Sequence, residues 1–169
     1  MNEIPKFVIE DFAQNEELED ILSWFDDAMS KRQDTTLLVS GPPGTGKTML
    51  IHAIAHRLEL NLVLVTHKEG LRNFNRDVHS MILFDDVNPM DFGSREQLIA
   101  VLDTEHLRSI RILYRDVEIP PHVIKVVTTN NKTAWIRWDG KTDGALERRV
   151  KSISINKPLF KQIPETTKE

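Results

Sequence analysis

The sequence feature that most constrains the fold is one octapeptide, Gly41-Pro42-Pro43-Gly44-Thr45-Gly46-Lys47-Thr48. It matches the pattern GxxxxGK[ST] at every position, with an apolar strand pattern before it and a helical pattern after it. Glycines let the backbone curl so that its N–H groups face an anion, and the dipole of the following helix favours the same anion. We therefore expect residues 41–48 to bind nucleotide phosphates, with Lys47 at the β- and γ-phosphates and the Thr48 hydroxyl on Mg²⁺.

The rest of the chain alternates between short apolar runs and helical patterns. Asn15 is predicted to cap a helix that reaches about Met29, and Ser94 with Gln97 forms a capping-box pattern at the start of another. Strands that alternate with helices predict a parallel α/β sheet covered on both faces. Strands are predicted over residues 36–40, 62–66, 81–84, 123–128 and 150–155, helices over 48–60 and 94–106, and a hairpin over 110–119.

Two of these predicted strands end in polar residues that suit a phosphate-binding site. Met81 to Phe84 is apolar and is followed by Asp85 and Asp86, while the segment Val126 to Asn130 reads VVTTN. An apolar run before two acids is by itself typical of a strand end and a solvated turn. The phosphate loop upstream favours a functional role for these two acids. We expect Asp85 to hold Mg²⁺, Asp86 to orient or deprotonate the attacking water, and Asn130 to contact that water or the γ-phosphate.

Two basic segments supply further candidate residues. Arg148 and Arg149 follow a short helical pattern, and a guanidinium there can stabilise charge on a γ-phosphate, often across a subunit boundary; Arg149 is the first choice. The predicted hairpin carries Arg111, Tyr114 and Arg115, a combination of cations and one ring that suits single-stranded nucleic acid. An exposed basic helix end and an ordinary amphipathic hairpin remain the alternatives for these two segments.

Composition excludes several classes of protein. The 169 residues contain no cysteine, which removes disulfides, thiol catalysis and cysteine-based zinc sites, and no apolar run is long enough for a membrane span. The N-terminus lacks the pattern of a secretory signal. The net charge of −4 argues against a non-specific nucleic-acid binder, but residues 1–30 hold nine acids against one lysine, and residues 105–151 are net basic.

Taken together, the motifs GPPGTGKT, ILFDD, VVTTN and ALERRVKSISI resemble superfamily 3 helicases, within the AAA+ P-loop ATPases. They are most similar to the helicase domain of replication-initiator (Rep) proteins from small circular single-stranded DNA viruses such as circoviruses. The resemblance covers roughly residues 36–157. It implies an AAA+-like P-loop fold with a β-hairpin before the sensor strand, and ATP and Mg²⁺ at Lys47, Thr48, Asp85 and Asp86.

The resemblance also implies a sensor, a finger and a pore hairpin. Asn130 would sense the γ-phosphate, the Arg148–Arg149 pair would act on a neighbouring subunit's nucleotide, and Arg115 would grip single-stranded DNA or RNA inside a ring, which is hexameric in such relatives. The tip here reads Tyr-Arg-Asp, where the family would carry a lysine. We expect an intracellular protein, located in the host nucleus if the source is a eukaryotic virus and otherwise in the cytoplasm, with any nicking enzyme on a separate chain.

These observations predict three regions and leave alternative functions open. The regions are an N-terminal helical arm over residues 1–34, the ATPase and helicase core over 35–157, and a flexible tail over 158–169. An AAA+-type helicase loader or remodelling switch without unwinding activity fits the same motifs, and a non-hydrolysing binding module is a third reading. A guanine-specific site is not predicted, because Asn131-Lys132-Thr133-Ala134 begins like NKxD but lacks the aspartate.

Overall fold

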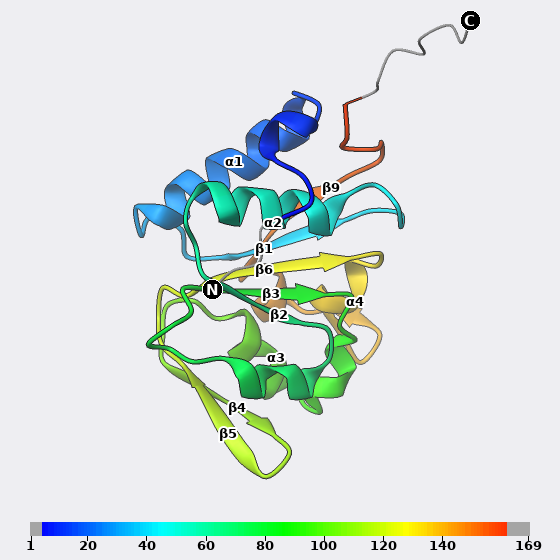
Figure 1. Cartoon of the computed structure of the whole chain (residues 1–169). Coiled ribbons are helices and arrows are strands. Elements are labelled where there is room, and N and C mark those ends of the chain that lie inside the picture. Colours follow the sequence, from blue (N-terminus) through cyan, green and yellow to red (C-terminus); the bar gives the residue numbers. More distant parts are fainter. Residues whose placement is uncertain (1–4, 162–169) are drawn as a thin grey trace, which may run out of the picture.

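A five-stranded parallel sheet forms the centre of the computed structural model, which describes residues 5–161. Its order is β2-β3-β6-β1-β9, and every neighbouring pair is parallel (Figure 1). This confirms the predicted α/β fold class. The strands are β1 (Thr36–Ser40), β2 (Leu62–Val65), β3 (Met81–Asp85), β6 (Ile124–Thr129) and β9 (Val150–Ser154).

Helices cover both faces of the sheet because successive strand residues point to opposite sides. Leu37 and Val39 of β1 pack with α1 (Glu16–Met29) and α2 (Lys47–Arg57), whereas Leu38 packs with α3 (Arg95–Leu102) and the hairpin. None of the described helices is both long and apolar enough to cross a membrane. The remaining elements are η1 (Ile9–Asp11), η2 (Lys68–Asn73), η3 (Pro89–Phe92), α4 (Thr133–Ile136), β7 (Arg137–Trp138), β8 (Lys141–Thr142) and α5 (Gly144–Glu147).

The predicted hairpin is confirmed, and it lies at the end of the molecule opposite to α1 (Figure 1). Strands β4 (Arg108–Ile112) and β5 (Arg115–Ile119) pair antiparallel, with Ile112 opposite Arg115. The two residues between them form a tight turn in which Tyr114 has a φ of 69°. The side chains of Ile110 and Val117 are buried in the same cluster as α3, against which β4 packs, so one face of the hairpin is part of the core.

Both predicted helix caps form, but the second differs in detail. Asn15 accepts a hydrogen bond from the Leu18 N–H at 2.9 Å, and Ser94 accepts one from the Gln97 N–H at 3.1 Å. The Gln97 side chain does not complete a capping box; its oxygen accepts from the Arg111 N–H at 2.7 Å and so ties α3 to the hairpin. Helix α3 ends at Leu102, earlier than the predicted end near residue 106, because the chain turns to an extended conformation at the next residue.

Helix α1 and the segment after β9 both contribute to the main core. Leu18, Ile21 and Phe25 are fully buried, and Leu159 joins the same cluster from the other end of the chain. The predicted region boundaries after residues 34 and 157 stay predictions. Of the predicted tail, residues 162–169 lie outside the described part of the chain.

Lys125, the second residue of β6, is an unusual core residue, since its side chain is fully buried. Its ammonium group donates to the Asp103 carbonyl at 2.6 Å and to the Ala100 carbonyl at 3.4 Å, at the C-terminal end of α3. Burial lowers the pKa of Lys125 to about 7, although the charge of Asp103 opposes the shift. Lys125 therefore connects the strand that leads to Asn130 with the base of the hairpin.

The Asp103 carboxylate forms the other half of this buried cluster. It accepts hydrogen bonds from the Glu105 N–H at 2.9 Å and from Arg108 Nε at 2.7 Å, and it lies 3.0 Å from His106 Nδ1. Burial alone would raise the pKa of Asp103, but these hydrogen bonds outweigh it and lower the pKa to about 2. Asp103 is therefore ionised at neutral pH and holds the first residue of β4 in place.

We predict that Lys125→Met removes a pH dependence from the free energy of unfolding. The pKa of Lys125 is about 7 in the folded chain and ordinary, near 10.5, in the unfolded chain, so the unfolded state binds more protons between these values. Wild-type stability should therefore rise with pH across that window relative to the variant, with a slope of at most about 1.4 kcal/mol per pH unit. Urea unfolding of both proteins at several pH values measures this difference, and a constant difference would contradict the assignment.

Gly41 allows β1 to pass directly beside the end of β9. A Cβ atom at this position would lie 2.2 Å from the carbonyl oxygen of Ile155. The two strand ends are joined there by a hydrogen bond from the Ile155 N–H to the Ser40 carbonyl at 2.7 Å. A residue without a side chain is thus required at the point where the phosphate loop leaves the sheet.

We expect Gly41→Ala to lower the free energy of unfolding by about 3 kcal/mol, because the added methyl group overlaps backbone that is held by strand pairing. Gly140→Ala is the matched control: it has a positive φ of 74° but open space around the added atom. Strain alone should cost this control about 1 kcal/mol. Denaturant titrations compare the two, and equal losses would mean that the contact with Ile155 is not limiting.

Candidate functional site

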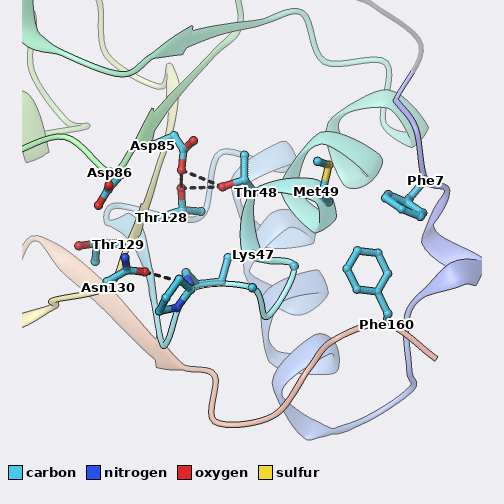
Figure 2. A pocket seen from close by; sticks show the side chains of 13 residues that line it. Phe7, Lys47, Thr48, Met49, Asp85, Asp86, Thr128, Thr129, Asn130 and Phe160 are labelled. Carbon is cyan, nitrogen blue, oxygen red and sulfur yellow. Dashed lines mark hydrogen bonds between the residues drawn. The ribbon is translucent and has the colours of Figure 1, made fainter. Parts of the chain in front are cut away.

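A pocket of about 480 Å³ lies where the polar ends of β1, β3 and β6 meet the start of α2 (Figure 2). Parallel pairing brings the carboxyl ends of these strands to one edge of the sheet, which is where open α/β sheets bind ligands. The pocket has a polar side and an apolar side. Its polar side chains are Lys47, Thr48, Asp85, Asp86, Thr128, Thr129 and Asn130, and its apolar ones include Phe7, Met49 and Phe160.

The phosphate loop leads directly into α2. Gly46 has a φ of 91° and occupies the N-cap position, so only the glycine backbone makes this entry without strain. The Lys47 ammonium group donates to the carbonyls of Gly41 at 2.9 Å and Pro42 at 2.7 Å, and to Asn130 Oδ1 at 3.3 Å. Burial lowers the pKa of Lys47, and the nearby carboxylates oppose this shift.

Asp85 connects the loop with the neighbouring strand. Its Oδ1 accepts hydrogen bonds from Thr48 Oγ1 and from Thr128 Oγ1, each at 2.8 Å. This is possible because Asp85 and Thr128 are directly paired in the register of β3 and β6. The hydroxyl of Thr48 and the carboxylate of Asp85, both predicted metal ligands, are therefore already adjacent.

Asp86 and Asn130 stand at the rim of the same pocket (Figure 2). Asp86 is exposed and has a φ of 53°, and its N–H donates to the Thr128 carbonyl at 2.9 Å. This backbone bond fixes the residue after Asp85 in a turn, so consecutive carboxylates both reach the pocket. The structure thus brings together five residues that the sequence proposed for catalysis or metal binding; their roles stay predictions. They are Lys47, Thr48, Asp85, Asp86 and Asn130.

Oxygen atoms, rather than histidines, dominate this site. Among residues 5–161, no group of three or more His, Asp or Glu side chains could hold a metal ion by itself. Mg²⁺ commonly takes only one or two protein oxygens and completes its shell with phosphate and water. Thr48 and Asp85 fit such a shared site, and they would be its protein ligands.

Arg148 and Arg149 do not line this pocket. The Arg149 carbonyl accepts from the Thr36 N–H at 2.8 Å, which places it at the start of β1, whereas the phosphate loop follows the end of β1. A five-residue strand is roughly 15 Å long, so Arg149 and the phosphate loop lie at opposite edges of the sheet. Arg149 Nη1 donates to the Ala145 carbonyl at 2.7 Å, while Arg148 is exposed.

The segment that carries the two arginines is firmly anchored. Asp143 caps α5 by accepting from the Ala145 N–H at 2.9 Å, and both of its carboxylate oxygens also bind the guanidinium of Arg95 at the start of α3. The hydrogen bond with Arg95 lowers the pKa of Asp143. Arg148 therefore projects from a fixed position on the molecular surface.

The three residues proposed for nucleic-acid binding differ in their surroundings. Tyr114 is 96% exposed at the hairpin tip, and the Arg111 side chain is 85% exposed. The Arg115 guanidinium, in contrast, donates to the Arg72 carbonyl on η2. The turn itself is fastened to η2 as well, through a 2.9 Å hydrogen bond from the Leu113 N–H to a Glu69 carboxylate oxygen.

Sequence reasoning missed Thr128, Met49 and the two phenylalanines of the pocket. Thr128 carried a signal, because a hydroxyl near the end of a buried strand beside Asp85 suits an acceptor that is held in place. Phe7 and Phe160 carried none, since they lie near the two ends of the chain and meet only in the folded structure.

A family model described as ATPase family associated with various cellular activities (AAA) matches residues 37–152. Among curated proteins, the 26S proteasome regulatory subunit 8 of Caenorhabditis elegans is 42% identical over 48 residues, which are 28% of this chain and 12% of that protein. The Replication factor C large subunit of Methanococcus maripaludis is 25% identical over 103 residues, or 61% of this chain and 21% of that protein. The chain therefore spans only a minor part of these relatives.

Solved structures show the same fold at low sequence identity. The apo C-terminal region of NrS-1 has a TM-score of 0.54 and 15% identity, with 92% of this chain and 41% of that chain covered. A mutant of RuvB from Thermotoga maritima has a TM-score of 0.56 and 22% identity, with 90% of this chain and 49% of that chain covered. Since the family model spans more than half of the sequence and includes the phosphate loop, β3 and β6, this chain belongs to the AAA ATPase family.

Proposed function

We propose that this chain hydrolyses ATP and uses the energy to move along single-stranded nucleic acid, as a helicase of the superfamily 3 type in the replication of a viral or mobile-element genome. The observation that carries the proposal is the convergence of Lys47, Thr48, Asp85, Asp86 and Asn130 on one pocket at the carboxyl edge of the sheet. Membership of the AAA family supports the hydrolase part.

In this proposal each side chain has one task. Lys47 exchanges its backbone carbonyl partners for phosphate oxygens, and Thr48 and Asp85 hold Mg²⁺, which would neutralise charge on the phosphates. Asp86 accepts the proton of the attacking water, for which its exposed position at the rim is suitable. Asn130 donates a hydrogen bond from its amide to the γ-phosphate or the water, while its oxygen remains beside Lys47.

The proposed enzyme works as a ring in which one subunit completes the site of the next. Lys47 is the only cation among the described residues that line the pocket, so charge that develops on a leaving phosphate lacks a second partner there. Arg148 and Arg149 lie at the other edge of the sheet and cannot serve the pocket of their own subunit. A ring, which we propose to be hexameric, would place this pair at a neighbour's nucleotide.

The nucleic-acid part of the proposal rests on the hairpin. Its most exposed side chains are an aromatic ring, Tyr114, and a nearby cation, Arg111, which together can stack on a base and contact a phosphate. Two relatives carry the name Replication factor C large subunit, which supports a role in DNA replication. In this proposal, any nicking enzyme that takes part in the replication is a separate chain.

A helicase loader or remodelling switch is the second candidate function, and a specific observation favours it. The hairpin is docked on η2 through Leu113 and Arg115, and an acidic partner accompanies Arg111, whose guanidinium lies 3.9 Å from Asp116. A hairpin that is docked in this way, and whose positive charge is partly balanced by an acid, suits a fixed protein-contact surface as well as the binding of a nucleic-acid strand.

Lys47→Ala is predicted to abolish ATP hydrolysis, because the ammonium group is the only cation that the described pocket offers to the phosphates. Removal of such a group should lower kcat by at least about 100-fold. A steady-state phosphate-release assay measures the rate, with circular dichroism to show that the variant folds. Hydrolysis at the wild-type rate in the folded variant would exclude this pocket as the catalytic site.

Tyr114→Ala should reduce the stimulation of ATP hydrolysis by single-stranded DNA or RNA about tenfold and leave the basal rate unchanged, because the ring is exposed and distant from the pocket. Arg57→Ala is the control, since this arginine is exposed at the end of α2. Stimulation that persists in Tyr114→Ala would favour the loader or switch over the translocase.

A further inference from the structure

Thr128 is a polar side chain of the pocket to which the proposed mechanism gives no task. It lies on β6, and its side chain is 1% exposed, whereas Thr48 is only partly buried. Figure 2 shows the two hydroxyls and the Asp85 carboxylate turned toward one another, with hydrogen bonds between them. A buried hydroxyl that is aimed at an expected metal ligand is a candidate for orienting that ligand.

The two oxygens of the Asp85 carboxylate have different surroundings. Oδ1 accepts both hydroxyl hydrogen bonds, from Thr48 and from Thr128, each at 2.8 Å. Within residues 5–161, no residue donates a hydrogen bond to Oδ2. A carboxylate has about four lone-pair sites on its two oxygens, so two donors saturate Oδ1 and leave Oδ2 available to a metal ion or to its water.

The two hydroxyl donors differ in what else they have to do. Thr48 is itself an expected metal ligand, so its hydroxyl would serve the ion and the carboxylate at once. Thr128 is directly opposite Asp85 in the register of β3 and β6, and the χ1 angle of a β-branched side chain is restricted. Thr128 is therefore the donor that can hold the carboxylate whether or not the ion is present.

We propose that Thr128 is a positioning residue that orients the Asp85 carboxylate for Mg²⁺ before the ion binds. This inference rests on the proposed binding of a nucleotide and Mg²⁺ at this pocket. The backbone already pairs β3 with β6 from Met81 to Asp85, so the side-chain bond is not needed to join the two strands. Groups that hold a metal ligand in place typically contribute about 10- to 100-fold to metal affinity.

The phosphate side of the pocket does not depend on this hydroxyl. Lys47 donates to the carbonyls of Gly41 and Pro42, to Thr45 Oγ1 at 3.3 Å and to Asn130 Oδ1, and none of these bonds involves Thr128. Loss of the Thr128 hydroxyl should therefore weaken the metal-dependent part of nucleotide binding and leave the metal-free part unchanged. A general disruption of the pocket would weaken both parts.

The test compares the binding of ADP with and without Mg²⁺, because ADP is not hydrolysed and the metal-free measurement reports the phosphate loop alone. Thr128→Val replaces the hydroxyl by a methyl group of similar size. It should raise the Kd for ADP about tenfold in excess Mg²⁺ and less than about twofold in EDTA, as measured by isothermal titration calorimetry on the full chain. Thr128→Ser keeps a hydroxyl and should bind ADP in Mg²⁺ within about threefold of the wild type.

Thr36→Val is the matched control. Thr36 is fully buried at the start of β1, at the other edge of the sheet, and its hydroxyl donates to the Leu102 carbonyl at 2.9 Å. This variant loses a buried strand hydroxyl in the same way, so it should share any loss of stability. It should nevertheless bind ADP like the wild type in Mg²⁺ and in EDTA, and denaturant titrations show whether both valine variants are folded.

Three results would overturn the positioning role. They are an unchanged affinity for ADP in Mg²⁺ in Thr128→Val, an equal loss of affinity in Mg²⁺ and in EDTA, and a wild-type Kd that Mg²⁺ does not alter. A wild-type chain that binds no ADP would overturn the proposed nucleotide site and this role with it. The titrations require neither hydrolysis nor nucleic acid, so a failure of the positioning role is distinct from a failure of the proposed translocase activity.

Discussion

The hydrogen bonds that Thr48 and Thr128 donate to one oxygen of Asp85 connect the parts on which this site depends. Thr48 belongs to the first turn of α2, Asp85 ends β3 and Thr128 lies near the end of β6. The contact exists only if β3 and β6 are parallel and paired in the observed register. The register of the sheet and the geometry of the phosphate site are therefore one constraint, and a slip of one residue would remove Asp85 from the pocket.

Much of this arrangement could be predicted from the sequence because the signals are local. The phosphate loop, the apolar runs that end in acids and the Asn15 cap each depend on residues close together in the chain, and the hairpin needed only a short strand-turn-strand pattern. The end of α3 could not be predicted, because the chain leaves the helix at Asp103, whose carboxylate accepts hydrogen bonds from the Glu105 N–H and from Arg108 Nε. The same holds for Phe7 and Phe160, which meet only after the sheet has brought the two ends of the chain together.

Fewer basic side chains are exposed and free in the structure than the sequence indicated. Residues 105–151 are net basic, yet Lys125 is buried, Arg108 is bound to Asp103 and Arg115 donates to a carbonyl. Residues 105–151 therefore expose fewer free cationic groups than their net charge suggests. Tyr114 and Arg111 are strongly exposed on the hairpin, where the acidic Asp116 and Glu118 are exposed as well, while the acidic helix α1 lies at the other end of the molecule (Figure 1).

The proposal that an arginine of one subunit completes the pocket of the next is tested most directly by a mixing experiment. Lys47→Ala lacks a working pocket but keeps Arg149, whereas Arg149→Ala keeps its pocket but lacks the proposed finger. If the arginine acts across a subunit boundary, mixtures of the two inactive variants will hydrolyse ATP faster than either alone, with a maximum at intermediate ratios. Mixed assemblies that remain inactive at every ratio would contradict the account.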